Sequence, residues 1–266
     1  MAHSTISHNS IEETNYRREF GGAETGAIKL HRTHNTTIEN NLIRQVRTID
    51  SKSSNGDGIW LDVENYENSI RNNVIVEVEG NSILMEANWV GTNDIENNIV
   101  VGGRLATFSA RDTVWRYNLL VDALGYWVNQ VDLDRPAIEG AIWSNNVFIR
   151  RGVADGPDAT RDNLYLGGAK RREGEQGAVV TSAEPHFAID MDDAEVTVSF
   201  AIDPAVYRRL HDRIGDGVDF YGHERGKGDF AFGPFSNVVA GKNCMSVFRC
   251  SPRRARALEI LRSGIR

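Results

Sequence analysis

The feature that most constrains the fold is a short phrase that recurs along the first 150 residues. The phrase has the form apolar-x-x-Asn-x-apolar, and its asparagines are Asn9, Asn41, Asn73, Asn98, Asn118 and Asn146. Successive asparagines are separated by 32, 32, 25, 20 and 28 residues. Helical solenoids repeat with a nearly constant unit, so these unequal gaps instead indicate a coil whose strands keep their length while its loops vary.

A second phrase precedes each later copy of the first. It occupies residues 28–31, 59–62, 83–86 and 106–109 and alternates apolar and other residues. This period of two is typical of a strand with one buried face. Two strand phrases per coil, stacked along one axis, predict an all-β chain folded as a right-handed parallel β-helix, with a further β-rich segment and a short helix after the coils.

The two phrases also predict what fills the coil. The apolar members of the second phrase are expected to point inward: Ile28, Leu30, Ile59, Leu61, Ile83, Met85, Ala106 and Phe108. The repeated asparagines are expected at inward corners, where superposed amides hydrogen-bond up the stack as a ladder. Asparagine could instead mark surface turns, but its recurrence at one place in six apolar phrases favours the ladder.

Three segments follow from this pattern. Residues 1–150 are predicted to form the coils that carry the functional site, and residues 151–236 to continue the β-helix and supply packing elements, including strands at 163–166 and 195–200 and a helix at 204–214. Residues 237–266 carry seven Lys or Arg against one Glu. They are predicted to be a basic tail, either disordered or helical.

Composition excludes several classes of protein. The chain has 30 Lys and Arg against 37 Asp and Glu, a net charge of −7, which argues against a nucleic-acid-binding surface. No apolar run approaches the roughly 20 residues of a membrane span, and no secretion signal is present at the start, so we expect a cytoplasmic protein with no membrane partner. Two cysteines support neither a disulfide framework nor a zinc site, and we predict no cofactor and no metal.

Stacking of the second phrases places two acids next to each other. Equivalent positions put His31, Asp62, Glu86 and Ser109 in one outward column and Lys29, Trp60, Leu84 and Thr107 in the next. Adjacent strands lie about 4.8 Å apart, so the Asp62 and Glu86 carboxyl groups should be about 5 Å apart. Retaining glycosidases need two carboxyl groups about 5 to 5.5 Å apart. The alternative is that both acids are ordinary solvated side chains on a sheet face.

Two tryptophans accompany this pair. An outward indole is unfavourable in water unless something stacks on it, and a sugar ring offers a suitable apolar face. Trp60 and Trp89 are therefore candidate sugar-binding residues, although Trp60 could equally be covered by a loop of the chain itself.

These residues lie in segments that resemble glycoside hydrolase family 120, the β-helix β-xylosidases. The resemblance covers about residues 6 to 236, includes residues 26–31, 58–62, 86–88 and 93–98, and is most specific at residues 58–62 and at Glu86. It also includes Glu24, Asp219, Phe220, Gly222, Arg225 and residues 233–235. It implies that Asp62 is the nucleophile, that Glu86 is the acid/base, and that His31 contacts sugar hydroxyls. Lys29, Glu24 and Asn88 are further candidate substrate-binding residues within or beside the matching segments.

The resemblance implies a small carbohydrate, a β-xyloside or short xylo-oligosaccharide, as substrate. Family members are longer, so the first coil here would present an open end, which we expect a homo-oligomer to cover. Two other functions stay open. One is a β-helix polysaccharide lyase, in which calcium would bridge Asp62 and Glu86 to an acidic sugar, and the other is a truncated β-helix that binds sugar without cleaving it.

Overall fold

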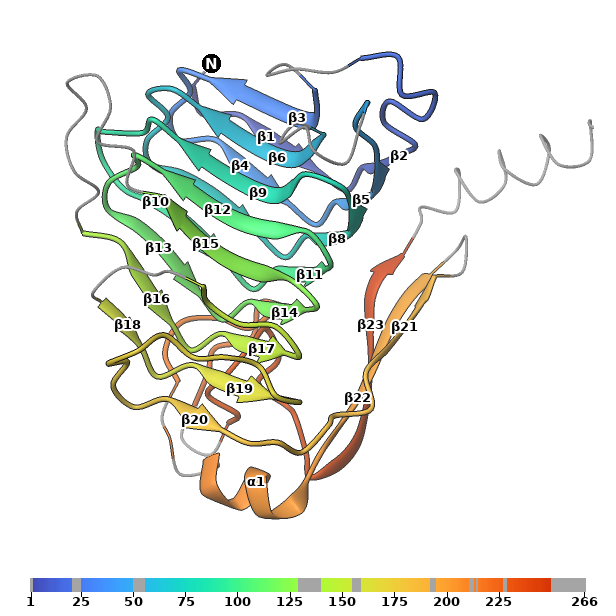
Figure 1. The fold of residues 1–266 in the computed structure, drawn as a ribbon, viewed down its shortest axis with the longest axis vertical. Coiled ribbons are helices and arrows are strands. Elements are labelled where there is room, and N and C mark those ends of the chain that lie inside the picture. Colours follow the sequence, from blue (N-terminus) through green and yellow to red (C-terminus); the bar gives the residue numbers. More distant parts are fainter. Residues whose placement is uncertain are drawn as a thin grey trace, which may run out of the picture.

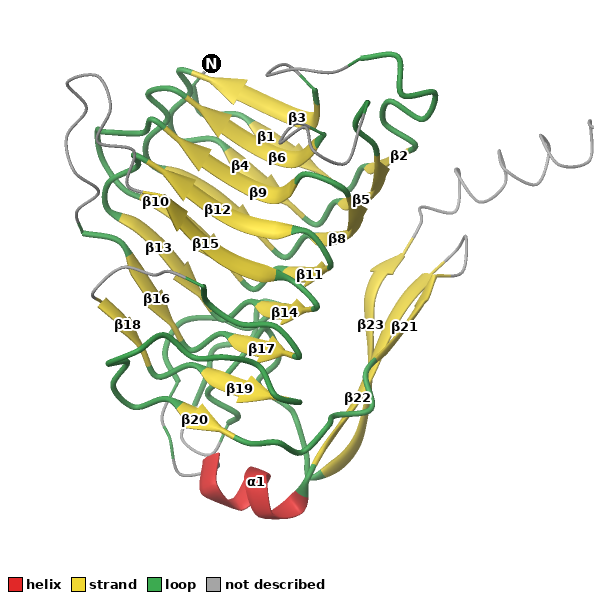
Figure 2. Ribbon diagram, in the orientation of Figure 1, coloured by secondary structure: helices red, strands yellow, loops and turns green. Residues whose placement is uncertain are grey.

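The computed structural model describes residues 2–20, 25–49, 56–128, 140–154, 159–191, 195–210, 213, 215–226 and 229–249. Within this part of the chain, strands from successive coils stack into three parallel sheets, and an antiparallel sheet and a short helix follow them (Figure 1). The strands are short, and within each parallel sheet they stack in the order of the sequence (Figure 2). This architecture is the predicted parallel β-helix.

The first five coils each contribute one strand to each parallel sheet, and the described strands β16 to β20 belong to sheets I and II. Sheet I contains β1 (Thr5–Ser7), β4 (Thr37–Glu39), β7 (Asn68–Arg71), β10 (Asn93–Glu96), β13 (Thr113–Arg116), β16 (Ile142–Ser144) and β18 (Ala159–Arg161). Sheet II contains β2 (Ser10–Glu12), β5 (Leu42–Val46), β8 (Val74–Val78), β11 (Ile99–Val101), β14 (Leu119–Val121), β17 (Val147–Ile149), β19 (Leu164–Leu166) and β20 (Val179–Val180). Sheet III contains β3 (Gly26–His31), β6 (Asp57–Asp62), β9 (Asn81–Glu86), β12 (Arg104–Phe108) and β15 (Leu124–Val128).

Apolar side chains superpose inside the coil because every strand alternates inward and outward positions. In sheet I the buried column runs Ile38, Ile70, Ile95, Trp115 and Trp143. The later coils use larger side chains, and the Trp115 and Trp143 rings stack with centroids 5.1 Å apart. The interior is thus a continuous stack of in-register side chains, which fixes the height of each coil relative to the next.

The asparagine ladder is confirmed. The side-chain Nδ2 of Asn9, Asn41, Asn73, Asn98 and Asn118 each donates to Oδ1 of the next asparagine at 2.9 to 3.0 Å. Asn146 extends the ladder to Asn163, which donates to the buried carboxylate of Glu175 at 2.8 Å. A buried polar group needs a partner, and here every amide supplies one to its neighbour, so the ladder reinforces the register that the core sets.

A second asparagine precedes the ladder residue in several coils. Asn40, Asn72, Asn97 and Asn145 have φ of 54°, 55°, 55° and 56° and form the corner between sheets I and II. Asparagine tolerates this left-handed conformation better than other side chains with a β-carbon. The Asn-Asn pairs of the sequence are therefore a corner residue followed by a ladder residue.

The antiparallel sheet, sheet IV, consists of β21 (Ala188–Met191), β22 (Glu195–Ile202) and β23 (Gly241–Arg249). Helix α1 (Pro204–Leu210) lies beyond the last coil (Figure 1). Val196, Val198, Met245 and Val247 of sheet IV join a buried cluster with the outer face of sheet II. That contact explains why strands such as β8 are apolar on both faces.

The fold class and the coil, strand and helix predictions for residues 163–210 are confirmed. The prediction of a disordered or helical tail is wrong for Gly241–Arg249, because alternate residues of β23 are buried and the strand pairs with β22. Residues 250–266 of the predicted tail lie outside the described residues. No helix in the described ranges is long and apolar enough to cross a membrane.

Candidate active site

The predicted carboxylate pair lies at the C-terminal ends of two adjacent strands of sheet III, β6 and β9. His31 pairs in register with Asp62, and Asp62 pairs with Glu86 on the next strand. All three point outward, because the residues before them, Leu30, Leu61 and Met85, fill the coil. Neighbouring strands are about 4.8 Å apart, so the geometry puts the two acids one strand spacing from each other.

The fourth member of this column differs from the prediction. Phe108, not Ser109, pairs with Glu86, and Leu105 takes the inward position predicted for Ala106. The register between β9 and β12 shifts by one residue at a bulge between Arg104 and Leu105. A one-residue shift exchanges the two faces of a strand, so Ala106 and Phe108 point outward and the predicted inward placement is wrong.

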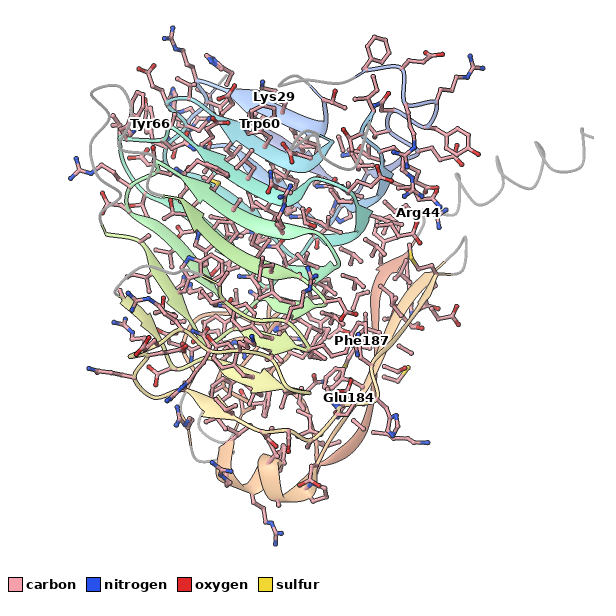
Figure 3. All side chains as sticks on the ribbon, viewed as in Figure 1. Lys29, Arg44, Trp60, Tyr66, Glu184 and Phe187 are labelled. Atoms are coloured by element: carbon pink, nitrogen blue, oxygen red, sulfur yellow. The ribbon has the colours of Figure 1, made fainter. Side chains whose placement is uncertain are left out.

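A lysine stands against the candidate nucleophile. Lys29 Nζ lies 3.1 Å from Asp62 Oδ2 and 3.6 Å from the centroid of the Trp60 ring. Figure 3 shows Lys29 and Trp60 near each other on the first two strands of sheet III, β3 and β6. The Lys29 and Asp62 side chains are only 20% and 16% exposed, so water screens the pair weakly. The ammonium offsets the repulsion that two neighbouring carboxylates would otherwise exert.

Beside the acids, the outer face of sheet III is apolar. Trp60, Leu84 and Ala106 form a buried cluster, with Phe108 packed against it. Trp60 is 3% exposed, and its Nε1 is buried with no hydrogen-bond partner in the described part of the chain. The expectation that Trp60 stacks on a sugar is therefore not met in this structure, since Lys29 lies over the ring and the cluster buries it. Its role here is to form the apolar floor next to Asp62.

Asn88 was predicted to bind substrate, and this prediction is wrong. Asn88 is fully buried and belongs to a second amide ladder one turn beyond the acids. Its Oδ1 accepts hydrogen bonds from the backbone and side chain of Asn65 at 2.7 and 3.1 Å, and its Nδ2 donates to the Leu61 carbonyl at 2.9 Å. Thr33 donates in the same way to Asn65. Asn88 therefore holds the turn that follows Glu86 rather than facing the solvent.

The remaining predicted residues are placed as follows. His31 is exposed at the end of β3, in the same column as Asp62. Trp89 is half-buried in the turn after Glu86. Glu24 lies outside the described residues.

Two residues of the family resemblance have structural roles. The Arg225 guanidinium lies 4.2 Å over the Tyr117 ring and donates to the carbonyls of Phe230 and Gly233 at 2.8 and 2.7 Å. The buried Asp219 accepts from the Ser236 hydroxyl at 2.7 Å. Arg225 thus holds the C-terminal segment to the coil, and Asp219 ties that segment together, both away from the acids.

Asp57 is a buried acid that the sequence patterns did not identify. It begins β6, has no exposed surface, and its Oδ1 accepts from the backbone and side chain of Asn81 at 2.6 and 2.9 Å. Burial raises the pKa of Asp57 to about 7, and the negative charge of Glu86 adds to this, while the Asn81 hydrogen bonds and Arg104 act in the opposite direction. The one available signal was an aspartate at the inward position of a strand start.

Known proteins share this fold. A model of the right-handed β-helix region matches residues 2–115. The solved structure titled "The complex structure of XylC with xylose" superposes with a TM-score of 0.73 at 18% sequence identity. The coil is a right-handed parallel β-helix. The superposition covers 93% of this chain and 48% of the XylC chain, so this chain spans about half the length of XylC. No curated protein sequence matches the chain significantly.

The described side chains contain no group of three or more His, Cys, Asp or Glu placed to hold a metal ion. The site built from these residues is thus a pair of carboxyl groups on adjacent strands, with a cation on one of them and an apolar floor alongside. Such a pair can act as a nucleophile and a proton donor toward one bond.

Proposed function

We propose that the chain is a retaining glycoside hydrolase acting on β-xylosides or short xylo-oligosaccharides. The observation that carries the proposal is the register of Asp62 and Glu86, which are outward neighbours on adjacent strands. Inverting enzymes separate their carboxyl groups by about 6.5 to 9.5 Å to leave room for water, whereas one strand spacing matches the retaining arrangement. The choice of xylose draws on the family resemblance and on the likeness to the xylose complex of XylC.

The proposed reaction has two steps. A carboxylate oxygen of Asp62 attacks the anomeric carbon while Glu86 donates its proton to the departing glycosidic oxygen, which leaves a glycosyl ester on Asp62. Glu86, now ionised, takes a proton from water, and the water oxygen attacks the anomeric carbon and releases Asp62.

The surroundings of the acids suit these roles. Lys29 keeps a positive charge 3.1 Å from the carboxylate that must be ionised to attack. The cluster of Trp60, Leu84, Ala106 and Phe108 provides an apolar surface beside the reacting groups. A desolvated neighbourhood strengthens the electrostatic interactions between the acids and a bound sugar.

Turnover of an aryl β-xyloside by the purified chain tests the proposal. Asp62→Ala should abolish turnover, and Glu86→Ala should be rescued by azide on a substrate with a good leaving group, because azide replaces the water that Glu86 activates. Glu39→Gln, which changes an outward acid on sheet I, is the matched control and should keep activity. Wild-type activity in Asp62→Ala would refute the assignment.

Two other experimental outcomes would replace the proposed hydrolase function with a different one. An unsaturated product that absorbs in the ultraviolet and needs calcium would identify a lyase. Binding of xylo-oligosaccharides by an inactive wild-type chain would identify a sugar-binding β-helix.

A further inference from the structure

A cavity lies across sheet I from the carboxylate pair. It has a volume of about 480 Å³ and lies between the corner of the first coils and strand β23. One wall carries His8 and Asn40, and the other carries Phe220, Tyr221 and Phe248. Figure 1 shows sheet IV rising alongside the coil, with β23 as the strand nearest to it. The size is in the range of ligand-binding pockets.

Asn40 of the polar wall belongs to the column of corner asparagines between sheets I and II, with Asn72, Asn97 and Asn145 in later coils. Lower in this column the side chains are used by the protein itself: Asn97 Nδ2 donates to the Val218 carbonyl at 2.9 Å and Asn145 Nδ2 donates to the Ala231 carbonyl at 3.1 Å. The C-terminal segment therefore accepts hydrogen bonds from the amides of Asn97 and Asn145. Asn40 is the equivalent residue in an earlier coil. Its side-chain amide has no hydrogen-bond partner among the described residues and lines the cavity.

The opposite wall is aromatic and rigidly held. Tyr221 is 40% exposed, yet its hydroxyl donates to the Ser246 carbonyl at 3.0 Å and its ring packs against Phe235 at 5.9 Å. A partly exposed ring that is fixed in place loses little conformational entropy when a ligand stacks on it. Tyrosine in this setting presents a ready apolar face beside polar partners.

The charge of the lining residues favours a neutral ligand. Arg249 lines the cavity, but its guanidinium pairs with Glu195 at 3.0 Å, so its charge is already balanced. An anionic ligand would compete with Glu195 for the Arg249 guanidinium, while a hydroxylated ring would meet amide and hydroxyl-bonding groups on one side and aromatic faces on the other.

We infer that this cavity is a second carbohydrate-binding site, separate from the carboxylate pair, that holds a neutral xylan chain. A pyranose ring stacks on Tyr221 while its hydroxyls bond to the free amide of Asn40. The inference rests on the proposed function only for the identity of the sugar, since the cavity itself is defined by its own residues. With a xylan chain in this cavity, the protein would stay bound to the polymer while the acids act at the other side of sheet I.

Affinity electrophoresis of the full chain in gels containing soluble xylan tests this inference. In an Asp62→Ala background, we expect the chain to be retarded, and Tyr221→Ala to weaken xylan binding about tenfold, the scale of one lost stacking contact. Asn40→Gly should weaken it as well, and it keeps the fold because glycine readily adopts the φ of 54° found there. Thermal melting of both variants confirms that they are folded.

Matched controls separate this cavity from the rest of the surface. Tyr16→Ala removes a more exposed tyrosine, and Asn35→Gly removes the amide of another corner asparagine with φ of 51°. Both controls should keep the retardation, and Tyr221→Ala in the otherwise native chain should keep aryl-xyloside turnover within about twofold, because a monosaccharide glycoside does not need a distant site.

The outcomes are distinguishable. Absence of retardation, or retardation unchanged by both Tyr221→Ala and Asn40→Gly, would overturn the second site. Loss of retardation with Tyr16→Ala instead would also overturn it. Retardation that depends on Tyr221, together with a wild-type chain that does not hydrolyse xylosides, would support the second site and refute the proposed function.

Discussion

The buried acid at the start of β6 should make the protein less stable as pH rises. Asp57 has no exposed surface, and its Oδ2 has no hydrogen-bond partner among the described residues. Its pKa is raised from an ordinary value of 3.8 to about 7, mainly by burial. The folded chain therefore holds a proton that the unfolded chain releases between these values. The contribution of the protonated Asp57 to the free energy of unfolding is fully present below pH 3.8 and is lost as the pH rises through about 7.

The size of the effect follows from the two pKa values. The difference between 3.8 and about 7 corresponds to about 4 kcal/mol in total. Linkage places more than half of this loss, about 3 kcal/mol, between about pH 5 and about pH 8.5. Asp57→Asn removes the titration but keeps an oxygen that can accept the two hydrogen bonds from Asn81. The variant should therefore lose that part of the pH dependence and be more stable than wild type at the alkaline end.

Urea unfolding followed by circular dichroism at several pH values measures this difference. Asp190→Asn, which changes an exposed acid on β21, is the control for the charge alone and should retain the wild-type profile. Parallel profiles for wild type and Asp57→Asn would refute the reasoning, since they would show that Asp57 titrates alike in the folded and unfolded chains.

Three further predictions test the ladder, the site and the C-terminal segment. Asn73→Ala, which orphans amide partners on both neighbouring coils, should lower the free energy of unfolding by about 3 to 5 kcal/mol, against about 1 kcal/mol for Asn9→Ala at the exposed end of the ladder, both measured by urea titration. Lys29→Gln should reduce kcat/KM for an aryl xyloside, whereas Lys29→Arg should largely preserve it, because only the first removes the cation beside Asp62. Arg225→Met should loosen the C-terminal segment and increase its amide hydrogen exchange, and unchanged exchange would contradict the role assigned to that guanidinium.

The coil, the ladder and the carboxylate column could be predicted because they depend on repetition. Where three successive strands keep the same spacing between apolar residues, as in residues 28–31, 59–62 and 83–86, the inward residues determine which outward residues meet. The fourth strand broke the rule at a bulge. Asn81 at the start of β9 donates its backbone N–H to the Asp57 side chain, a local contact that no periodicity reveals.

Other errors have comparable causes. The Asn88 ladder contains only Asn65 and Asn88, with Thr33 in the preceding coil, too few copies to stand out as a repeat. The strand Gly241–Arg249 has alternate buried residues, but the excess of basic residues around it dominated the interpretation of that segment. The cover over Trp60 is a tertiary contact and could not be predicted from the local sequence.

Covalent trapping tests the assignment of Asp62 and Glu86 most directly. A 2-deoxy-2-fluoro-xyloside with a good leaving group slows hydrolysis of the glycosyl ester more than its formation, so the ester accumulates on a retaining enzyme. Mass spectrometry of the intact chain should show one added fluoro-xylosyl group, and peptide mapping should locate it on Asp62. Labelling of another residue, or turnover of xylosides with inversion and no adduct, would contradict the account.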